Sequence, residues 1–430
     1  MGDRASRTRA RSVVFLNRFY WPDIAATGQM LTDLAEGLAA LNWDVTVITS
    51  NTSYDASRGS AALPWRERRN GVQIVRTPCT RFGRGALLGR FVDYATYLGG
   101  AAAMLAAGKR PSVIVAMSDP PMLAALAWLM GKVRRARSVY WVQDLFPDLL
   151  ARLQLLSDET PLYRGLRAFA SFVHRRCDLV VALGPTMVDA LIAAGAPPER
   201  TTYVHNWADA DAVVPMSADE NAFLAEHGLR GKFVVLYSGN AGRAHTFDAV
   251  LDAARALRDD DNVVFVFVGG GPRTAELKRA VARDGLQNVR FFPYVDRARL
   301  GEVLSAATVS LVTENPAVEG LLVPSKTYGI LASGRPIVLL GPAGSDVARV
   351  VRDTESGVVL PPESGRALTE WLIAAKRDPS LIDRLGRNAR LAAEQTFNKR
   401  SSIAQWAALM ETTSPRSGAL NMVRQQASAP

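Results

Sequence analysis

Two cations in the second half of the chain follow loops that suit a phosphate group. Gly239, Gly242 and Arg243 come directly after the apolar run "FVVLYS", and Lys326 lies in "LLVPSKTYG". A glycine-bearing turn between a strand and a helix exposes backbone N–H groups and the positive end of a helix dipole, and both favour anions. We expect each cation at a helix start, where one diphosphate could lie between them. The alternative is that the glycines only make the turn and the cations only face solvent.

The acidic side chain before Lys326 is Glu319, which could accept hydrogen bonds from the hydroxyls of a sugar or a ribose. Known nucleotide motifs do not account for these loops, because neither has the Gly-Lys-Ser/Thr of a P-loop or the G-x-G-x-x-G of a dinucleotide site. The strands "DVTVITS" and "VVFVFVG" also lack the terminal acidic residue that binds the ribose of NAD. NAD is therefore disfavoured as a cofactor.

Each half of the chain begins with the same module of strand, loop, helix and strand. Residues 12–17 and 44–50 read as buried strands around a helix in the first half, and residues 232–238 and 262–271 repeat the pattern in the second. Such β-loop-α-β units form parallel sheets. The sequence therefore predicts two doubly wound α/β domains, each with its loops at the carboxyl ends of the strands.

We expect the following domain boundaries. They are an N-terminal domain at 12–205, a linker at 206–222, a C-terminal domain at 223–400, a final helix at 401–413 and a tail at 414–430.

Composition and charge restrict the class of protein. The 430 residues are 48% hydrophobic and 21% charged, which is typical of a globular protein, and two cysteines make neither a disulfide framework nor a metal cluster. Up to Ala210 there are 25 Lys and Arg against 17 Asp and Glu, and the remainder has 26 against 24. The positive excess lies in the first half, so nucleic acid, anionic lipid and phosphorylated substrates are the candidate partners.

The chain resembles family 4 glycosyltransferases of the GT-B fold, over about residues 12 to 413. The resemblance is strongest to bacterial enzymes of O-antigen, colanic-acid and capsule synthesis, including fucosyl- and N-acetylfucosaminyltransferases. It rests on the stretches "YWPDIAATGQMLTDLAEGLA", "SDPP", "VQDLFPD", "VHNW", "YSGNAGRAHTFD" and "VPSKTYGILASGRP".

The resemblance implies two domains that face each other across a cleft, an acceptor-binding domain at 12–205 and a nucleotide-sugar-binding domain at 223–400, with the final helix at 401–413 crossing back to the N-terminal domain. It also implies a retaining transfer of a sugar from a nucleotide-diphospho-sugar, UDP-linked or similar, to a polyprenyl-diphosphate-linked glycan. Arg243 matches the family's diphosphate-binding arginine, and Lys326 resembles its cationic partner. Many members carry a lysine shortly after the arginine, which this chain lacks. Glu319 matches the first of two family glutamates, whereas Gly329 stands at the second.

In the first half, the resemblance places Gly28 and Gln29 in the loop that faces the donor phosphates. Asp119 and Asp144 follow strands and should face the same side of the sheet. Asp144 is the residue that we expect to touch the transferring sugar or the acceptor hydroxyl. Its alternative role is to cap or link the loop "DLFPD".

We expect no metal and no separate cofactor. The sequence "DAD" at 209–211 matches the metal-binding D-x-D of a different glycosyltransferase fold, but it lies in the predicted linker. The electrostatic stabilisation of the leaving diphosphate would then come from the two cations.

Residues 80–108 mix arginines with phenylalanines and leucines, which suits an anionic membrane surface. The arginines are Arg81, Arg84 and Arg90. A core helix with a basic rim is the alternative. With the family resemblance, the segment predicts a cytoplasmic enzyme that is peripheral on the inner face of the plasma membrane.

Two other functions remain as alternatives. A nucleotide-sugar 2-epimerase also uses paired α/β domains, but it has no need of a basic and apolar acceptor-side segment. A nucleic-acid-binding protein should show aromatic and basic strand patterns or a recognition helix, and neither is present in the sequence. We therefore expect no nucleic acid partner.

Overall fold

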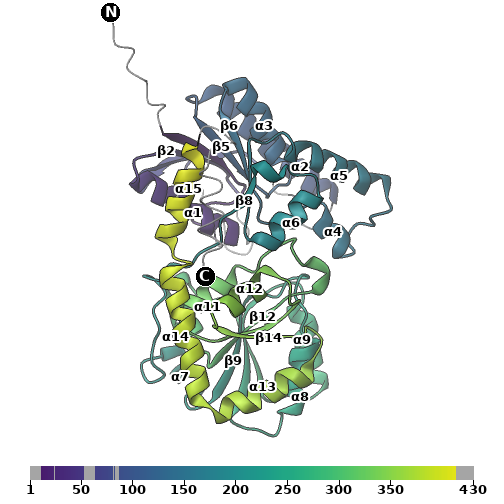
Figure 1. Cartoon of the computed structure of the whole chain (residues 1–430), viewed down its shortest axis with the longest axis vertical. Coiled ribbons are helices and arrows are strands. Elements are labelled where there is room, and N and C mark those ends of the chain that lie inside the picture. Colours follow the sequence, from purple (N-terminus) through teal and green to yellow (C-terminus); the bar gives the residue numbers. More distant parts are fainter. Residues whose placement is uncertain (1–10, 24, 53–62, 81, 83–86, 413–430) are drawn as a thin grey trace, which may run out of the picture. The chain divides into compact units, whose positions relative to one another are not determined.

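The computed structural model describes residues 11–23, 25–52, 63–80, 82 and 87–412, and two sheets organise them (Figure 1). The first compact unit holds the described residues up to Asp148, then Ser157–Val204 and residues 403–412. The second unit holds Leu149–Leu156 and His205–Ser402.

The first unit is built on an eight-stranded sheet in the order β3-β4-β2-β1-β5-β6-β7-β8. All neighbouring strands are parallel except the pair β3 and β4. The strands are β1 (Ser12–Leu16), β2 (Asp44–Ser50), β3 (Arg66–Arg69), β4 (Val72–Thr77), β5 (Val113–Met117), β6 (Arg137–Trp141), β7 (Leu179–Ala182) and β8 (Thr201–Tyr203).

Helices cover both faces of this sheet, so its central strands are buried on both sides and read as continuous apolar runs. On one face α2 (Leu87–Ala107) and α3 (Leu123–Arg134) pack on β1, β2 and β5. On the other face lie α1 (Ala26–Ala40) and α15 (Lys399–Glu411), where Ile403 packs against Gly37 and Trp406 against Trp141. The remaining helices are α4 (Asp148–Arg152), α5 (Pro161–His174), α6 (Pro185–Ala193) and the 3-10 turn η1 (Pro198–Arg200).

The second unit is a six-stranded, fully parallel sheet in the order β11-β10-β9-β12-β13-β14. The strands are β9 (Phe233–Asn240), β10 (Val263–Gly270), β11 (Val289–Phe292), β12 (Val309–Thr313), β13 (Ile337–Leu340) and β14 (Gly357–Leu360).

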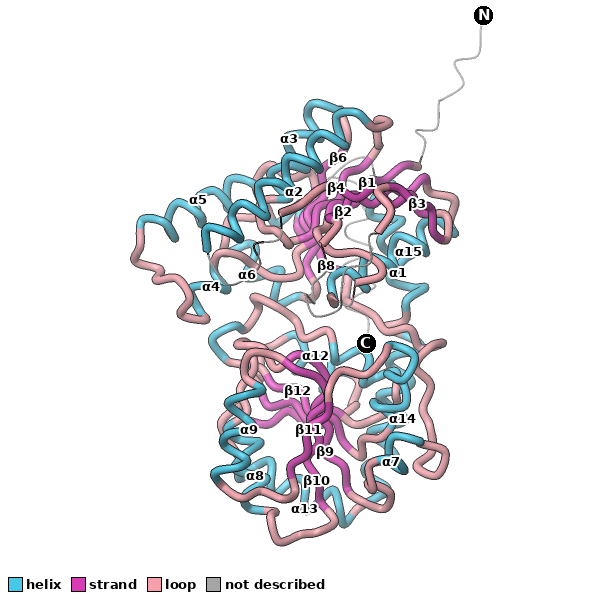
Figure 2. Tube along the Cα trace, turned by 180° about the vertical axis from the view of Figure 1, so that it is seen from behind, coloured by secondary structure: helices cyan, strands magenta, loops and turns pink. Residues whose placement is uncertain are grey.

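Two helical layers enclose this second sheet (Figure 2). The helices α8 (Asp248–Ala256), α9 (Thr274–Arg283) and α13 (Gly365–Arg377) contribute to one apolar core with β9 and β10. The other helices and turns are α7 (Ala222–Glu226), η2 (Arg297–Arg299), α10 (Leu300–Ser305), η3 (Pro316–Val318), α11 (Lys326–Ala332), α12 (Asp346–Asp353) and α14 (Pro379–Gln395).

The prediction of two parallel-sheet α/β domains is confirmed. The stretch predicted as a linker is held to the second unit, because Arg390 of α14 donates hydrogen bonds to the carbonyls of Val213 and Ala210, at 2.7 and 3.0 Å. None of the described helices combines the length and the apolarity that crossing a bilayer requires. Because all the strands except β3 run in the same direction in their sheet, the loops after their carboxyl ends gather at one edge of each sheet, where open α/β sheets bind ligands.

Candidate active site

Lys326 is the first residue of α11 and lies at the carboxyl edge of the second sheet. Its ammonium nitrogen is buried and has no hydrogen-bond partner within the described residues. Burial lowers the pKa of this ammonium well below its ordinary value. A buried, unpartnered cation is costly unless an anion or polar group compensates it, so Lys326 is positioned to receive one.

The side chain of Lys326 runs alongside the end of strand β9. A Cβ at Gly239 would lie 3.6 Å from Lys326 Cε and 3.7 Å from its Nζ, and Gly239 has a φ of +126°. That backbone conformation strains any L side chain, so glycine suits the position. Two of the predicted binding residues, Gly239 and Lys326, are therefore brought together.

The loop after β9 is fastened to the loop after β12. His245 Nδ1 lies 2.5 Å from the carbonyl oxygen of Thr313, and the backbone N–H of Asn315 donates to the carbonyl of Ala244 at 2.9 Å. Burial, with the nearby charge of Lys326, lowers the pKa of His245 to about 3, so the imidazole is neutral at physiological pH. The neutral ring keeps Nδ1–H as a donor to the carbonyl, and the two loops form one surface.

The prediction that Arg243 begins a helix is wrong, because α8 begins only at Asp248. Arg243 lies in a turn, is exposed, and makes no hydrogen bond or ion pair within the part of the chain that the structure describes. β9 ends at Asn240, and residues 244–247 separate Arg243 from the first residue of α8. Gly242, its neighbour, is half-buried, and a Cβ there would contact Asn240 Nδ2 at 3.4 Å.

Glu319 follows the short turn η3 and is exposed. Its Oε1 lies where a Cβ at Gly344 would clash with it, so glycine gives this carboxylate room beside the loop after β13. Ser325 occupies the cap position of α11, but its side chain makes no cap hydrogen bond, contrary to the capping role expected from its type. Gly329, at the position of the second family glutamate, faces Leu304, whose Cδ1 would lie 3.3 Å from an added Cβ.

Glu314, at the end of β12, is a buried carboxylic acid that the sequence pattern did not single out. It is 5% exposed, and its Oε2 has no hydrogen-bond partner among the described residues. Burial raises its pKa to about 7, and the charges of Asp346 and Glu319 act in the same direction. The sequence shows only an acidic residue after an apolar run, which is the ordinary pattern of a strand end.

Two aromatic residues were also missed. The ring of Tyr237 faces the ammonium of Lys326, and the half-exposed ring of Tyr294 lies over Gly269 and Gly270, 3.2 Å from where their Cβ atoms would be. Tyr237 and Lys326 are far apart in the sequence, and so are Tyr294 and the two glycines. The spacing of residues in the sequence therefore does not reveal either contact.

In the first unit, Asp144 and Asp119 follow the neighbouring strands β6 and β5. The Ser118 hydroxyl accepts the backbone N–H of Asp144 at 3.1 Å and of Gln143 at 3.2 Å, which joins the two strand ends. Burial raises the pKa of Asp144 to about 6, and the charge of Asp119 contributes. The two acids are therefore close enough to interact, as their strand-end positions predicted.

The placement of Gly28 and Gln29 in a loop is wrong, since both lie in the first turn of α1. Asp23 Oδ1 accepts the N–H of Ala25 at 2.9 Å just before the helix. The helix begins at Ala26, earlier than the leucines at helical spacing, which start at Leu31, suggest. A Cβ at Gly28 would lie 3.2 Å from the carbonyl oxygen of Phe19. The need for glycine there is explained by close packing of the helix on its preceding loop.

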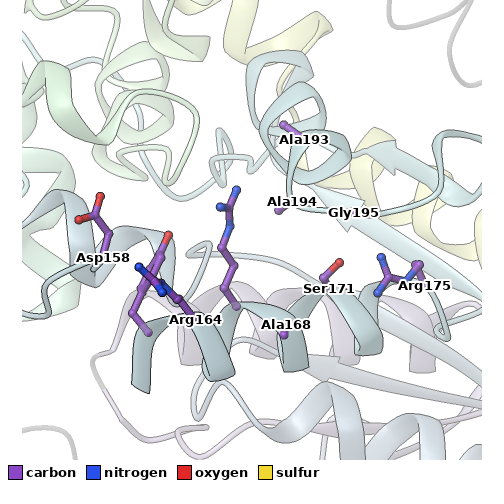
Figure 3. A pocket seen from close by; sticks show the side chains of 10 residues that line it. Asp158, Arg164, Ala168, Ser171, Arg175, Ala193, Ala194 and Gly195 are labelled. Atoms are coloured by element: carbon purple, nitrogen blue, oxygen red, sulfur yellow. The ribbon is translucent and has the colours of Figure 1, made fainter. Parts of the chain in front are cut away.

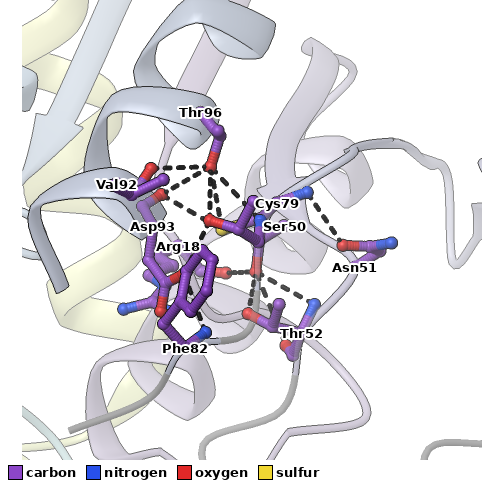
Figure 4. Close-up of polar contacts among 10 residues, drawn as sticks. Arg18, Ser50, Asn51, Thr52, Cys79, Phe82, Val92, Asp93 and Thr96 are labelled. Atoms are coloured by element: carbon purple, nitrogen blue, oxygen red, sulfur yellow. Dashed lines mark hydrogen bonds and ion pairs between the residues drawn. The ribbon is translucent and has the colours of Figure 1, made fainter. Parts of the chain in front are cut away.

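A polar network joins the ends of β1 and β2 to α2 in the first unit (Figure 4). Arg18 Nη2 lies 3.6 Å from Asp93 Oδ2, and the backbone N–H of Arg18 donates to the carbonyl of Asp119 at 3.2 Å. Thr80 Oγ1 donates to Asp93 Oδ1 at 2.7 Å, and the Ser50 hydroxyl donates to the carbonyl of Arg18 at 2.8 Å. The network holds the edge on which Asp144 and Asp119 lie.

Among the described residues, no group of three or more His, Cys, Asp or Glu side chains could hold a metal ion. The aspartates of "DAD" have partners of their own, because Asp209 pairs with Lys399 at 2.8 Å and Asp211 with Arg400 at 3.2 Å.

Within 80–108, Arg81 and Arg84 lie outside the described residues. Phe82 and Phe91 are 65% and 64% exposed, and Arg90 is half-buried.

Two family models match the chain. Residues 26–207 match a glycosyl transferase 4-like domain, and residues 219–392 match glycosyl transferases group 1.

Three bacterial proteins are among those similar to this chain. The probable glycosyltransferase WbjE of Pseudomonas aeruginosa is 27% identical over 70% of this chain and 74% of its own length. The putative colanic acid biosynthesis glycosyl transferase WcaI of Escherichia coli strain K12 is 26% identical over 90% and 96%. The solved structure of Anabaena Alr3699/HepE in complex with UDP and glucose has a TM-score of 0.70, with 17% identity, and covers 93% of this chain and 99% of that one. It supports the GT-B fold.

Proposed function

Because the chain belongs to the glycosyltransferases, with a glycosyl transferase 4-like domain followed by a group 1 domain, we propose that it moves a sugar from a nucleotide-diphospho-sugar to a lipid-linked glycan. The product would be part of a cell-surface polysaccharide, as the name of the relative WcaI, a putative colanic acid biosynthesis glycosyl transferase, suggests. The acceptor would be a polyprenyl-diphosphate-linked glycan at the cytoplasmic face of the membrane.

The observation that carries the donor proposal is the buried ammonium of Lys326 beside Gly239. A diphosphate oxygen supplies the negative charge that this cation lacks. Charge-assisted hydrogen bonds from lysine to phosphate are about twice as strong as neutral ones. Arg243, exposed in the adjacent loop and without an ion-pair partner in the described chain, is the second cation of the proposed site.

A UDP-linked donor is favoured because the structural neighbour HepE was solved with UDP and glucose. Glu319, with its carboxylate beside Gly344, is proposed to accept hydrogen bonds from hydroxyls of the donor sugar. Gly329 leaves α11 without a second carboxylate, so the ribose would need a different partner than in relatives with two glutamates.

Retention of the anomeric configuration is proposed to occur by attack on the same face from which the diphosphate leaves. Lys326 and Arg243 would stabilise the developing charge on the leaving group, which is often the largest contribution to such catalysis. Asp144 of the first unit is proposed to touch the acceptor hydroxyl or the transferring sugar. Below about pH 6 its carboxyl group would be protonated, so it would carry an O–H donor and lose the negative charge of the carboxylate.

Membrane attachment through residues 80–108 remains part of the proposal. The exposure of Phe82 and Phe91 supports it, since exposed aromatic side chains beside arginines suit a membrane interface.

The test is a thermal-shift panel of UDP- and GDP-sugars on the full chain, followed by incubation of the best donor with a short polyprenyl-diphosphate acceptor. One donor should raise the melting temperature, because a ligand that binds only the folded state stabilises it by mass action. NMR of the product should show the donor's anomeric configuration. Inversion would overturn the mechanism. Epimerisation of UDP-N-acetylglucosamine without acceptor would instead point to a 2-epimerase.

A further inference from the structure

Arg18, which follows β1 in the first unit, carries a charge that its surroundings balance only in part. Its side chain is 14% exposed, and within the described residues its one ion pair is with Asp93, whose Oδ2 lies 3.6 Å from Nη2. That separation is longer than a hydrogen bond. The Nε of Arg18 is buried and has no hydrogen-bond partner among those residues. Leaving a donor of a charged group unpaired is costly, so the position suits an anion that the protein itself does not supply.

Asp93 is engaged by other donors (Figure 4). Its Oδ1 accepts a hydrogen bond from the hydroxyl of Thr80 at 2.7 Å and another from the backbone N–H of Phe82 at 3.1 Å. The nearby thiol of Cys79 adds no negative charge, because burial raises its pKa. The alternative role of Arg18 is that of an ordinary buried ion pair, but such a pair is stabilising only with close geometry and further hydrogen bonds. The described contacts of the Arg18 guanidinium provide neither.

The backbone of Arg18 is fixed, so the guanidinium is held in a defined place. The carbonyl of Arg18 accepts hydrogen bonds from the hydroxyls of Ser50 at 2.8 Å and Thr49 at 2.9 Å, and its N–H donates to the carbonyl of Asp119 at 3.2 Å. The guanidinium carbon lies 5.3 Å from the centroid of the Phe19 ring. A cation that is already ordered loses little conformational entropy when it binds an anion.

A second group of arginines in the first unit differs in its exposure. Arg164, Arg167 and Arg175 line a pocket of about 590 Å³ between α5 and the end of α6 (Figure 3). All three are exposed, so water solvates their charges, and Asp158 lines the same pocket. These arginines therefore need no bound anion, and they provide a matched control for Arg18.

We propose that Arg18 binds the diphosphate of the lipid-linked acceptor in the first unit. This inference rests on the proposed function, in which the acceptor carries a diphosphate next to a prenyl chain. A guanidinium binds phosphate oxygens through two parallel hydrogen bonds. Phe82, whose N–H contacts Asp93, is 65% exposed and supplies an apolar surface for the chain beside the diphosphate.

The experiment is calorimetric titration of the full chain, saturated with UDP, with farnesyl diphosphate. This probe carries a diphosphate on a short prenyl chain, and bound UDP keeps it from the proposed donor site at Lys326. We expect Arg18→Met to lose affinity for the probe by about 10- to 100-fold, the effect of one hydrogen bond to a charged group. Arg18→Lys keeps the charge without the planar fork and should lose a part of that affinity. The control Arg175→Met should bind the probe like the wild type.

Titration with UDP alone separates this inference from the proposed function. If the wild type does not bind UDP, the proposed donor site is wrong, and the Arg18 variants are compared without UDP. If UDP binds but the wild type, Arg18→Met and Arg18→Lys bind farnesyl diphosphate equally, the role of Arg18 is wrong and the donor site stands. Melting temperature and UDP affinity check that each variant is folded. If Arg18→Met does not fold, wild-type affinity in Arg18→Lys would overturn the inference.

Two further probes identify the part of farnesyl diphosphate that Arg18 binds. Farnesol should bind equally weakly to the wild type and to Arg18→Met, and a loss confined to the variant would show that the substitution acts on apolar packing. Pyrophosphate that binds as tightly as farnesyl diphosphate, and depends on Arg18, would overturn the lipid-linked acceptor as occupant in favour of free diphosphate. Loss of farnesyl diphosphate binding in Arg175→Met instead of Arg18→Met would assign the diphosphate to the pocket between α5 and α6.

Discussion

The ammonium nitrogen of Lys326 lies 3.5 Å from the centroid of the Tyr237 ring, and within the described residues it has no hydrogen-bond acceptor. The face of an aromatic ring attracts a cation by about 2 kcal/mol when both are desolvated. Removing an ammonium from water costs more than that unless it is fully paired. Burial therefore destabilises the charged form of Lys326 in the free enzyme, and a bound diphosphate would stabilise that form.

Replacing Lys326 with Met keeps the length of the side chain and removes the charge. We expect the melting temperature of the free protein to rise, because the uncompensated buried cation is gone. We expect donor affinity to fall by about 1.5–3 kcal/mol, the contribution of a hydrogen bond to a charged group. Differential scanning fluorimetry and calorimetric titration with UDP-sugar measure the two effects.

The matched control for this change is Lys278→Met. Lys278 also faces an aromatic ring, that of Phe291 at 5.6 Å, but it is exposed. The variant Lys278→Met should leave donor affinity unchanged. Because the pKa of Lys326 is lowered in the folded state, the unfolded chain binds more protons at alkaline pH, and wild-type stability should rise toward pH 10 relative to Lys326→Met. Unchanged donor affinity in Lys326→Met would remove this lysine from the donor site.

Arg243→Ala should separate binding from folding. Arg243 is exposed and makes no ion pair within the described chain, so its loss should change the free energy of unfolding by less than about 0.5 kcal/mol. Transfer should nevertheless fall by tenfold or more, because a charge-assisted phosphate contact is lost. Steady-state kinetics with Arg352→Ala as the exposed control measure this, and equal activity of the two variants would contradict it.

Glu314→Gln should change how stability depends on pH. The folded-state pKa is raised to about 7, so the folded state binds more protons than the unfolded one between about pH 4.5 and 7. Wild-type stability should therefore fall as pH rises through this window, by at most about 3.4 kcal/mol. Urea unfolding at several pH values should show a flatter profile for Glu314→Gln. The exposed Glu370→Gln should behave like the wild type, and a wild-type slope in Glu314→Gln would show that another group titrates.

The fold followed from features that are local in the sequence. Residues 12–17 and 44–50 are apolar runs at the ends of a helical stripe, and both are strands within one residue of the predicted bounds. The early start of α1 was missed because its first turn, with Gly28 and Gln29, carries no apolar periodicity. Arg243 was predicted to begin a helix, but α8 begins only at Asp248. The glycines show that a turn follows β9, but they do not show how many residues separate that turn from the helix.

The contacts within the candidate site depend on which strands are neighbours in the sheet, and residue spacing in the sequence does not reveal them. Gly239 and Lys326 are both recognisable as residues of loops, but their contact requires β9 and β12 to be neighbours. The burial of Glu314 and the pairing of Lys326 with Tyr237 arise from packing across elements. A sequence pattern predicts which residues reach the edge of the sheet, whereas tertiary packing decides which of them remain without a partner.

Asp144→Asn tests the acid of the first unit. If the ionised carboxylate contacts the acceptor hydroxyl, wild-type kcat should decline below about pH 6, the raised pKa of Asp144. The asparagine variant should be slow at every pH and lack this decline. Its stability should not fall, because a buried acid beside another acid has been replaced by a neutral group of the same shape. The exposed Asp189→Asn should keep the wild-type profile, and an unaltered profile in Asp144→Asn would leave this residue a structural role.

The last prediction is that transfer continues in excess EDTA. Both aspartates of the D-x-D sequence are engaged by cations, Asp209 by Lys399 at 2.8 Å and Asp211 by Arg400 at 3.2 Å. Lys326 and Arg243 could provide the positive charge that a metal ion supplies to a leaving diphosphate in other enzymes. We expect initial rates with and without EDTA to agree within about twofold, and added Mg²⁺ or Mn²⁺ to produce no large activation. Asp211→Asn, whose ion pair is exposed, should be equally active in both conditions. Complete loss of transfer in EDTA that Mn²⁺ restores would show that a metal carries the charge, and the roles of Lys326 and Arg243 would then need a different explanation.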